Sequence, residues 1–319
     1  MPDFNIFIAG VRIIFRTSHQ SDITCVRELF LYHLDEEKQR REPGFSHTVI
    51  VESLDNSPNI VEIARLRWSG QVNSGMPAQW YDTVSGNENL ICVGDDIVIS
   101  HQPEQRLTVC YLVELSDGVS KKHRPNLSGC VFFLIQSILS MYGRYCLHAS
   151  CVSKEGKACL FLGKSGEGKS TISYRLAKHG FEYMGDDLVF LSLADEGGLV
   201  VDAYLSRVKL QKKMTSEAKT AIDILKDGKS NYAYQSKLVA IVRLQRDLLG
   251  KESLFVPANP TEVFEWLINS ANNSRIQYHP RLWLDICEKA AGIPAYTLMF
   301  GDKEYFNPET VNDILQNGL

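Results

Sequence analysis

The sequence predicts an α/β protein in two parts: a strand-rich α+β part over residues 1–125, and an α/β part over residues 126–319. Two kinds of pattern support this prediction. In the first part, short stretches of β-branched and aromatic residues follow one another between turn signals. From about residue 129 onward, apolar runs of helical and strand length alternate, and a glycine-rich loop joins one strand to the next helix.

The first part contains stretches typical of strands and one stretch typical of a helix. Residues 23–39 have apolar side chains at helical spacing, with Asp22 as an N-cap. The polar tract at residues 116–129 is interpreted as a linker or exposed loop. Strands are predicted at residues 1–16, 47–54, 60–68, 89–100 and 106–115.

Composition is that of an ordinary globular protein. The chain has 319 residues, of which 44% are hydrophobic and 23% charged, and its formal net charge is −4. A chain of this length can bury a sizeable core. Because the net charge is slightly negative, neither nucleic acid nor an anionic membrane is expected as a partner, and any affinity for phosphate must be local.

Neither an export signal nor a membrane span is expected. Residues 1–16 carry Arg12 and Arg16 in an alternating pattern, without the apolar run of a signal peptide. The most apolar run, residues 131–139, is too short to span a bilayer and contains Gln136, so a buried helix is predicted there. The 8 cysteines form no CxxC pair, and we expect them to be reduced core residues of a cytoplasmic protein.

The glycine-rich loop fits the pattern GxxxxGK[ST], which is typical of phosphate-binding loops. The apolar run at residues 158–162 precedes it, as a strand should. The stretch 170–179 has helical spacing, and Gly180 suits a left-handed C-cap. The predicted nucleotide-binding residues are Gly163, Lys164, Ser165, Gly166, Glu167, Gly168, Lys169, Ser170 and Thr171.

The residue types of this loop account for the expected chemistry. Its glycines let backbone N–H groups point inward as an anion-binding nest, and the helix N-terminus adds partial positive charge. Lys169 supplies a full charge to the β- and γ-phosphates, and the Ser170 hydroxyl is a ligand for Mg²⁺. The sequence therefore predicts a nucleotide and Mg²⁺ as ligands, against the alternative of a glycine-rich turn that binds nothing.

A histidine upstream of the loop is a candidate for a role at the phosphates. Residues 146–163 read as a hairpin, and a turn at Glu155–Gly156 places His148 opposite Gly163. A histidine there can orient an anion, donate a proton to it, or influence a neighbouring acid. The alternative is a core histidine whose hydrogen bonds are satisfied by backbone.

Two adjacent carboxylates follow the helix and the next predicted strand, residues 181–184. Ligands bind at such strand ends in α/β sheets, so Asp186 and Asp187 are expected at the site. One can hold Mg²⁺, while the other accepts the proton of an attacking hydroxyl. The alternative is a pair that caps a turn. Asp202, at the end of the apolar run 199–202, is a rival metal-binding acid.

Together, LHAS at residues 147–150, GKSGEGKST and GDD resemble the HPr kinase/phosphorylase family. They are more similar still to the HPr kinase-related serine kinases of peptide-modification gene clusters, including those for lasso peptides. The resemblance covers roughly residues 129–319, with core strands at 236–246 and 291–298. It implies the nucleotide-binding fold of phosphoenolpyruvate carboxykinase and phosphorylation of a Ser or Thr hydroxyl from ATP and Mg²⁺.

By position, the resemblance implies a role for each candidate residue. Asp187 would be the general base, Asp186 a metal-associated acid and His148 a helper on the phosphate side. Lys169 would bind phosphate, and Ser170 would bind the metal.

Two departures from the family pattern bear on the acceptor. Residues 205–213 lack the glutamate that helps to hold metal in the HPr-acting enzymes, and residues 291–306 lack the arginines of a late signature. HPr itself is therefore not the expected acceptor. Arg207 and Lys229 are candidate cations for the transferred phosphate, or equally surface charges. The family also makes a homo-oligomer possible.

Three functions remain open at this point. The first is a cytoplasmic kinase for a hydroxyl of a peptide or protein, such as a ribosomal precursor peptide of the lasso type, with residues 1–125 as a recognition domain. The second is a small-molecule hydroxyl kinase. The third is a regulatory module that binds ATP without transferring phosphate.

Overall fold

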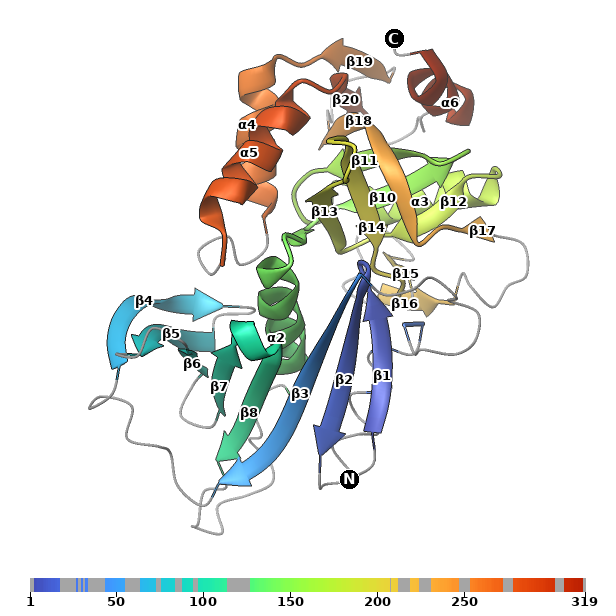
Figure 1. Cartoon of the computed structure of the whole chain (residues 1–319). Coiled ribbons are helices and arrows are strands. Elements are labelled where there is room, and N and C mark those ends of the chain that lie inside the picture. Colours follow the sequence, from blue (N-terminus) through green and yellow to red (C-terminus); the bar gives the residue numbers. More distant parts are fainter. Residues whose placement is uncertain are drawn as a thin grey trace. The chain divides into compact units, whose positions relative to one another are not determined.

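The structure is a computed structural model with mixed α/β architecture and large sheets, as predicted (Figure 1). It divides into two compact units, and each is described by itself. Unit 1 comprises Met1–Tyr142 with Arg275–Tyr278, and unit 2 comprises Gly143–Ser274 with His279–Leu319. The described residues are 3–17, 27, 30, 32–33, 44–54, 64–72, 76–83, 88–93, 97–113, 127–206, 208–211, 219–223, 231–246, 253–271, 278–301 and 307–317.

Within the described residues, unit 1 has an 8-stranded sheet in the order β1-β2-β3-β8-β7-β6-β5-β4. The β2–β3 and β3–β8 pairs are parallel, and the others are antiparallel. The strands are β1 Asp3–Ile8, β2 Val11–Thr17, β3 Phe45–Leu54, β4 Ala64–Val72, β5 Met76–Thr83, β6 Asn89–Val93, β7 Ile97–Gln102 and β8 Leu107–Val113, with a short 3₁₀ helix η1 at Pro103–Gln105.

Most of the predicted strands of unit 1 are confirmed, with three differences. The stretch predicted as one strand at 1–16 forms two antiparallel strands, β1 and β2, with Ile8 opposite Val11. The stretch predicted as one strand at 89–100 forms two antiparallel strands, β6 and β7, with Val93 opposite Ile97. Strand β5 was not predicted, because Pro77 and Asp82 are unfavourable in a strand. The predicted helix at 23–39 lies largely outside the described residues.

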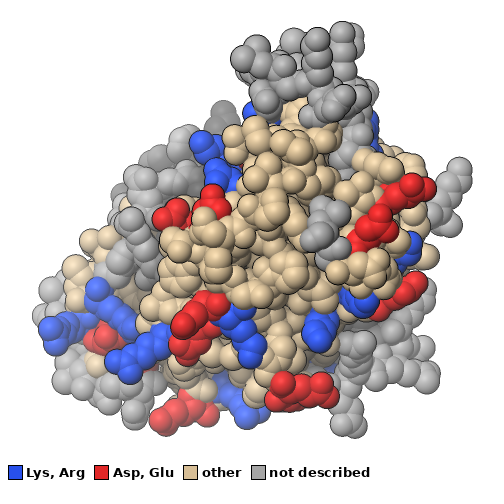
Figure 2. All heavy atoms as spheres, turned by 90° about the horizontal axis from the view of Figure 1, so that it is seen from above, with Lys and Arg blue, Asp and Glu red and all other residues tan. Residues whose placement is uncertain are grey.

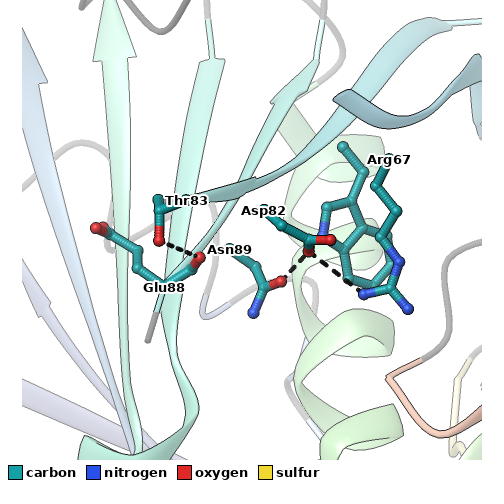
Figure 3. Close-up of polar contacts among 6 residues, drawn as sticks. Arg67, Asp82, Thr83, Glu88 and Asn89 are labelled. Carbon is teal, nitrogen blue, oxygen red and sulfur yellow. Dashed lines mark hydrogen bonds and ion pairs between the residues drawn. The ribbon is translucent and has the colours of Figure 1, made fainter. Parts of the chain in front are cut away.

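The outer strands of this sheet are joined by side-chain contacts (Figure 3). Arg67 of β4 lies 3.5 Å from the Asp82 carboxylate of β5, and its guanidinium is 4.7 Å from the centre of the Trp80 ring. The Trp80 indole N–H donates to Asn89 of β6 at 3.4 Å. Tyr278, where the chain re-enters unit 1, packs its ring 5.2 Å from that of Trp80. These contacts connect β4, β5 and β6 through their side chains.

Helix α2, Leu127–Met141, confirms the buried helix predicted at 131–139. It clusters with unit 1, whereas the sequence placed the domain boundary before it, at residue 125. Its contacts explain this difference. The Phe132 ring stacks on Phe30 at 6.1 Å, and the Ser137 hydroxyl oxygen lies 3.0 Å from Nε2 of His101 in β7. The polar tract marks a loop, but it does not show on which body the following helix packs.

A buried chain of hydrogen bonds fixes α2 against the sheet of unit 1. The Ser137 hydroxyl donates to the Leu134 carbonyl at 2.8 Å, so its oxygen accepts from His101 Nε2. A neutral His101 then accepts at Nδ1 from the Thr108 hydroxyl of β8, at 2.7 Å. The network thus assigns the tautomer of His101.

The same series of hydrogen bonds continues to a second histidine, His47. Thr108 accepts from Nε2 of His47 in β3 at 2.8 Å, and Nδ1 of His47 accepts from the Tyr142 hydroxyl at 2.9 Å. Burial lowers the pKa of His47 to about 4, with the charge of Arg106 acting in the same direction. Burial also lowers the pKa of His101 to about 3, with a further contribution from His47. Both rings are therefore neutral in the folded state at neutral pH.

Unit 2 has a 10-stranded sheet within the described residues. Its main path runs β17-β12-β10-β11-β18-β14-β13-β9, β20 pairs with β18, and β19 pairs with β20. Strands β15 and β16 pair separately. The strands are β9 Tyr145–Leu147, β10 Ser150–Lys154, β11 Lys157–Leu162, β12 Glu182–Gly185, β13 Val189–Leu193, β14 Leu199–Ala203, β15 Val208–Gln211, β16 Lys219–Ile222, β17 Asn231–Tyr232, β18 Gln235–Arg246, β19 Leu254–Pro257 and β20 Ala295–Phe300.

The helices of unit 2 complete its core. Helix α3 packs against β10 and β12, and α4 packs against α5. The C-terminal helix α6 buries Val311, Ile314 and Leu315 in one cluster with residues of β11, α3 and β18. The strand predicted at 236–246 is confirmed as β18. The strand predicted at 291–298 is found as β20, but it begins only at Ala295, because helix α5 continues to Ala291. The helices are α3 Lys169–Lys178, α4 Pro260–Ser270, α5 Pro280–Ala291 and α6 Pro308–Asn317.

The described cysteines are free thiols, as predicted, and all but one of them lie in the core. Cys92, Cys110, Cys146, Cys151, Cys159 and Cys287 are free, and all but Cys92 are buried. A search of the described helices finds none with the length and hydropathy that crossing a bilayer requires.

Lowering the pH should destabilise the protein through the buried histidines. Their pKa values are lowered on folding from the ordinary value of 6.5, so their contribution is complete above pH 6.5 and is lost as the pH falls toward 4 and 3. Within that window, each histidine lowers the free energy of unfolding by at most about 1.4 kcal/mol per pH unit. Urea unfolding at a series of pH values measures this slope.

His101→Gln provides the comparison, because glutamine keeps a donor and an acceptor but does not titrate. The variant should show a shallower dependence of unfolding free energy on pH than the parent, by about the slope of one group. Equal slopes for the two proteins between pH 4 and 6.5 would contradict the assignment of a neutral buried His101.

Candidate functional site

The phosphate-loop strand is one half of a tight hairpin. Ser150 of β10 pairs with Phe161 of β11, and Lys154 pairs with Lys157, which is the predicted register. Glu155 and Gly156 form the turn with φ of 53° and 75°, the left-handed conformation of a two-residue hairpin. The hairpin fixes where β11 ends and therefore where the loop begins.

The loop itself runs from Gly163 to Gly168, between β11 and α3. Gly163 has φ of 153°, and a Cβ there would lie 3.2 Å from the Leu244 carbonyl oxygen of β18. Gly168 caps α3 with φ of 96°. The Glu167 carboxylate accepts from the Lys164 backbone N–H, which closes the loop on itself. The conformation therefore requires glycine where the sequence supplies it.

Lys169 opens helix α3 and is buried, at 6% exposure, with its ammonium at the loop. Nζ donates to the Gly163 carbonyl at 2.7 Å and to the Lys164 carbonyl at 3.1 Å. The positive charge is thus held at the mouth of the loop, next to the N-terminus of α3. This combination attracts an anion such as a phosphate group.

Strand β10 links the start of α3 to the second part of the site. The Ser150 hydroxyl donates to the Lys169 carbonyl at 3.1 Å. On its other edge β10 pairs with β12, where Cys151 lies opposite Gly185. Asp186 and Asp187 follow directly after β12, as predicted. The phosphate loop and the two acids therefore flank a single strand.

His148 lies outside the hairpin ladder, which ends at Ser150. The backbone N–H of His148 donates to the Ser270 carbonyl at 2.8 Å, and Leu147 before it pairs with Val189 of β13. The prediction that His148 lies opposite Gly163 is therefore wrong, because strand β10 begins only at Ser150. Instead, Nδ1 of His148 lies 3.1 Å from Oδ1 of Asp187. The structure brings this predicted pair together.

The two carboxylates have different surroundings. Asp187 is 62% exposed, and His148 beside it is 42% exposed. Asp186 is 4% exposed, and its Oδ1 accepts a 2.8 Å hydrogen bond from the Tyr183 hydroxyl. An accessible acid and a buried, hydrogen-bonded acid suit the two roles expected of the pair.

The rival acid Asp202 has a structural role. It is 2% exposed in β14, and its Oδ1 accepts from the Gln235 amide of β18 at 2.8 Å. Its Oδ2 lies 3.4 Å from the Ser192 hydroxyl of β13. These hydrogen bonds join three neighbouring strands, so Asp202 stabilises the sheet.

The residues of the site fit Mg²⁺ brought by a nucleotide. The side chains predicted to bind it, Ser170 and Asp186, offer oxygen atoms, which Mg²⁺ prefers. Among the described residues, no group of three His, Cys, Asp or Glu side chains is placed to hold a metal by itself. One or two protein oxygens combined with phosphate oxygens is the usual arrangement for Mg²⁺ in phosphotransferases.

Arg207 and Lys229, the candidate phosphate cations, lie outside the described residues. Tyr183 was missed by the sequence analysis, and so was the need for Gly185. A tyrosine three residues before a strand-end acid was the only signal for the first. A glycine directly before the acid pair was the signal for the second.

One face of the molecule can be judged for its charge. Figure 2 shows Lys and Arg side chains interspersed with Asp and Glu, without a broad region of one sign on the described part of that face. This agrees with the formal net charge of −4.

Of three comparisons with known proteins, the one with solved structures finds matches. No family model matches the chain, and no curated protein matches it. A solved structure described as the HPr(Ser) kinase/phosphatase from Coxiella burnetii matches 54% of this chain and 88% of its own. The two are 15% identical, with a TM-score of 0.33. The function is therefore inferred from the residues of the site.

Gly185 should be the most sensitive glycine of the site. Its φ is +156°, and a Cβ would lie 2.7 Å from the Leu188 carbonyl oxygen and 3.2 Å from that of Tyr204. Gly185→Ala should therefore lower the unfolding free energy by about 1–3 kcal/mol and displace the acids that follow. Chemical denaturation measures the loss.

Gly180→Ala is the matched control. Gly180 also has positive φ, at +87°, but no atom lies within 4 Å of its would-be Cβ. It should cost about 1 kcal/mol, from backbone strain alone. If the two variants are equally stable, the close approach at Gly185 has no energetic consequence.

Proposed function

We propose that this chain is a kinase that transfers the γ-phosphoryl group of ATP, with Mg²⁺, to a hydroxyl of a peptide or protein, with serine as the acceptor residue. The single observation that supports this best is the pair of Asp187 and His148, which are both accessible and lie 3.1 Å apart. Asp187 follows β12, and only strand β10 separates β12 from β11, which leads into the phosphate loop. A nucleotide-binding domain like that of HPr kinase and phosphoenolpyruvate carboxykinase is part of this proposal.

The residues divide the work of the reaction. The loop N–H groups and Lys169 bind the phosphates and neutralise their charge. Asp187 accepts the proton of the acceptor hydroxyl. The oxygen of that hydroxyl forms a bond to the γ-phosphorus, while the bond between the γ-phosphorus and the oxygen that bridges to the β-phosphate breaks. ADP leaves with the negative charge. When bound, Mg²⁺ neutralises phosphate charge, and Ser170 and Asp186 would hold it.

His148 would orient the general base. Its Nδ1 lies 3.1 Å from Oδ1 of Asp187, within reach of a hydrogen bond, which restricts the carboxylate to one orientation. The helper role expected for His148 would therefore be exerted on Asp187, the residue that it contacts.

The exposure of the acids favours a large acceptor. Asp187 is 62% exposed, so the residues of unit 2 do not enclose it as they would enclose a small substrate. A peptide or protein acceptor is large enough to cover the exposed Asp187 itself and so exclude water from the site. We propose unit 1 as the module that recognises this acceptor. A precursor peptide of the lasso type is the acceptor that the family resemblance suggests.

Nucleotide binding should depend on Lys169. Lys169→Ala removes the charge at the mouth of the loop, and we expect the affinity for ATP to fall at least tenfold. Isothermal titration calorimetry with ATP and Mg²⁺ measures this. Lys178→Ala, at the far end of the same helix, is the control and should bind as the parent does. Unchanged affinity in Lys169→Ala would contradict a phosphate-binding role for the loop.

Phosphoryl transfer should depend on Asp187. Asp187→Asn keeps the size of the side chain but cannot accept the proton, so kcat should fall by about 10²–10⁴ while ATP affinity changes little. The assay is transfer of labelled phosphate from ATP to a panel of peptides, followed by mass spectrometry.

The control for this variant is Asp195→Asn, an exposed acid in the turn between β13 and β14. It should transfer phosphate at the parent rate. If Asp187→Asn also retains the parent rate, Asp187 is not the general base. If the parent releases only free phosphate with every acceptor, the regulatory or ATP-hydrolysing alternatives are favoured.

A further inference from the structure

Tyr183 is a buried side chain whose hydroxyl is directed at the site. It lies in the middle of β12, is 0% exposed, and donates to Oδ1 of Asp186 at 2.8 Å. Donor and acceptor are only three residues apart in the chain. The contact exists because the backbone turns sharply after the strand, at Gly185.

The backbone around Tyr183 is held on both sides. It lies opposite Val152 of β10 and opposite Tyr232 of the parallel strand β17, and its carbonyl accepts from the Ala233 N–H at 3.2 Å. The position of the phenol is therefore set by the sheet. A hydroxyl on such a rigid support can fix the orientation of a neighbouring group.

The phenol is a reliable donor. Its hydroxyl lies 2.8 Å from Oδ1 of Asp186, and a phenol next to a carboxylate donates the hydrogen bond. A carboxylate that is 4% exposed requires such donors to remain charged.

We propose that Tyr183 is a positioning residue that holds the Asp186 carboxylate in the orientation needed to bind Mg²⁺. This inference rests on the proposed function, in which Asp186 is a ligand of the nucleotide-bound metal. Hydrogen bonds from outside the ligand shell orient carboxylate ligands, and their loss typically weakens metal affinity by about 10–100-fold.

Tyr183→Phe tests this with the smallest change, because it removes the hydroxyl and keeps the ring. ATP binding is measured by calorimetry in EDTA and then across a series of Mg²⁺ concentrations. We expect the affinity for metal-free ATP to equal that of the parent. The Mg²⁺ concentration that gives half of the metal-dependent gain in affinity should rise about tenfold or more.

Tyr145→Phe is the matched control. Tyr145 is also in unit 2, is 1% exposed, and donates its hydroxyl to a backbone carbonyl, that of His279, at 2.8 Å. Its removal should have a similar effect on stability, with no shift in the Mg²⁺ dependence. A shift confined to Tyr183→Phe supports the positioning role. Equal Mg²⁺ dependence in the parent and both variants overturns it.

The binding measurement separates this inference from the proposed function. If the parent binds ATP with Mg²⁺ but transfers phosphate to no acceptor, the kinase proposal fails while the role of Tyr183 can still be decided. If Tyr183→Phe loses affinity for metal-free ATP as well, the hydroxyl supports the fold of the site rather than the metal ligand, and the inference is wrong. Circular dichroism and thermal denaturation confirm that both variants are folded.

Discussion

The position of strand β10 is the constraint on which the site depends. One edge pairs with β11, which leads into the phosphate loop, and the other pairs with β12, which ends at the two acids. Hydrogen bonds between strands hold neighbours about 4.8 Å apart, so the strands that lead to the loop and to the acids are about 10 Å apart across β10. Ser150 at the start of β10 adds a hydrogen bond to the first residue of α3. The pairing of β10 with both of its neighbours therefore brings together groups from two separate segments of the chain.

The second determinant is the unequal burial of two adjacent carboxylates. Consecutive residues at a strand end point in different directions, and here one direction leads into the sheet and the other to the surface. Asp186 meets the Tyr183 phenol inside, whereas Asp187 meets His148 outside. A buried acid with a fixed donor is suited to hold a cation, and an exposed acid is suited to exchange a proton. The geometry thus supplies a physical reason for two acids in a row.

Unit 1 is stabilised by different means. Its core contains a continuous hydrogen-bonded chain through two neutral histidines, which joins α2 to three strands of the sheet. Such a network specifies one packing arrangement, because every donor and acceptor needs its partner. Tyr278 adds to this core from a distant part of the sequence, with its ring 5.6 Å from that of His101.

Features that depend on neighbouring residues could be predicted from the sequence. The loop glycines, the helix that follows, the hairpin turn at Glu155–Gly156 and the acids after β12 all depend on residues close together in the chain, and all are found where predicted. Tertiary structure alone decided which acid is buried, that His148 meets Asp187, that Asp202 is absorbed by the sheet, and that α2 belongs to unit 1. These outcomes depend on which strands become neighbours, and the pairing of strands is set by the packing of the whole unit rather than by any short segment.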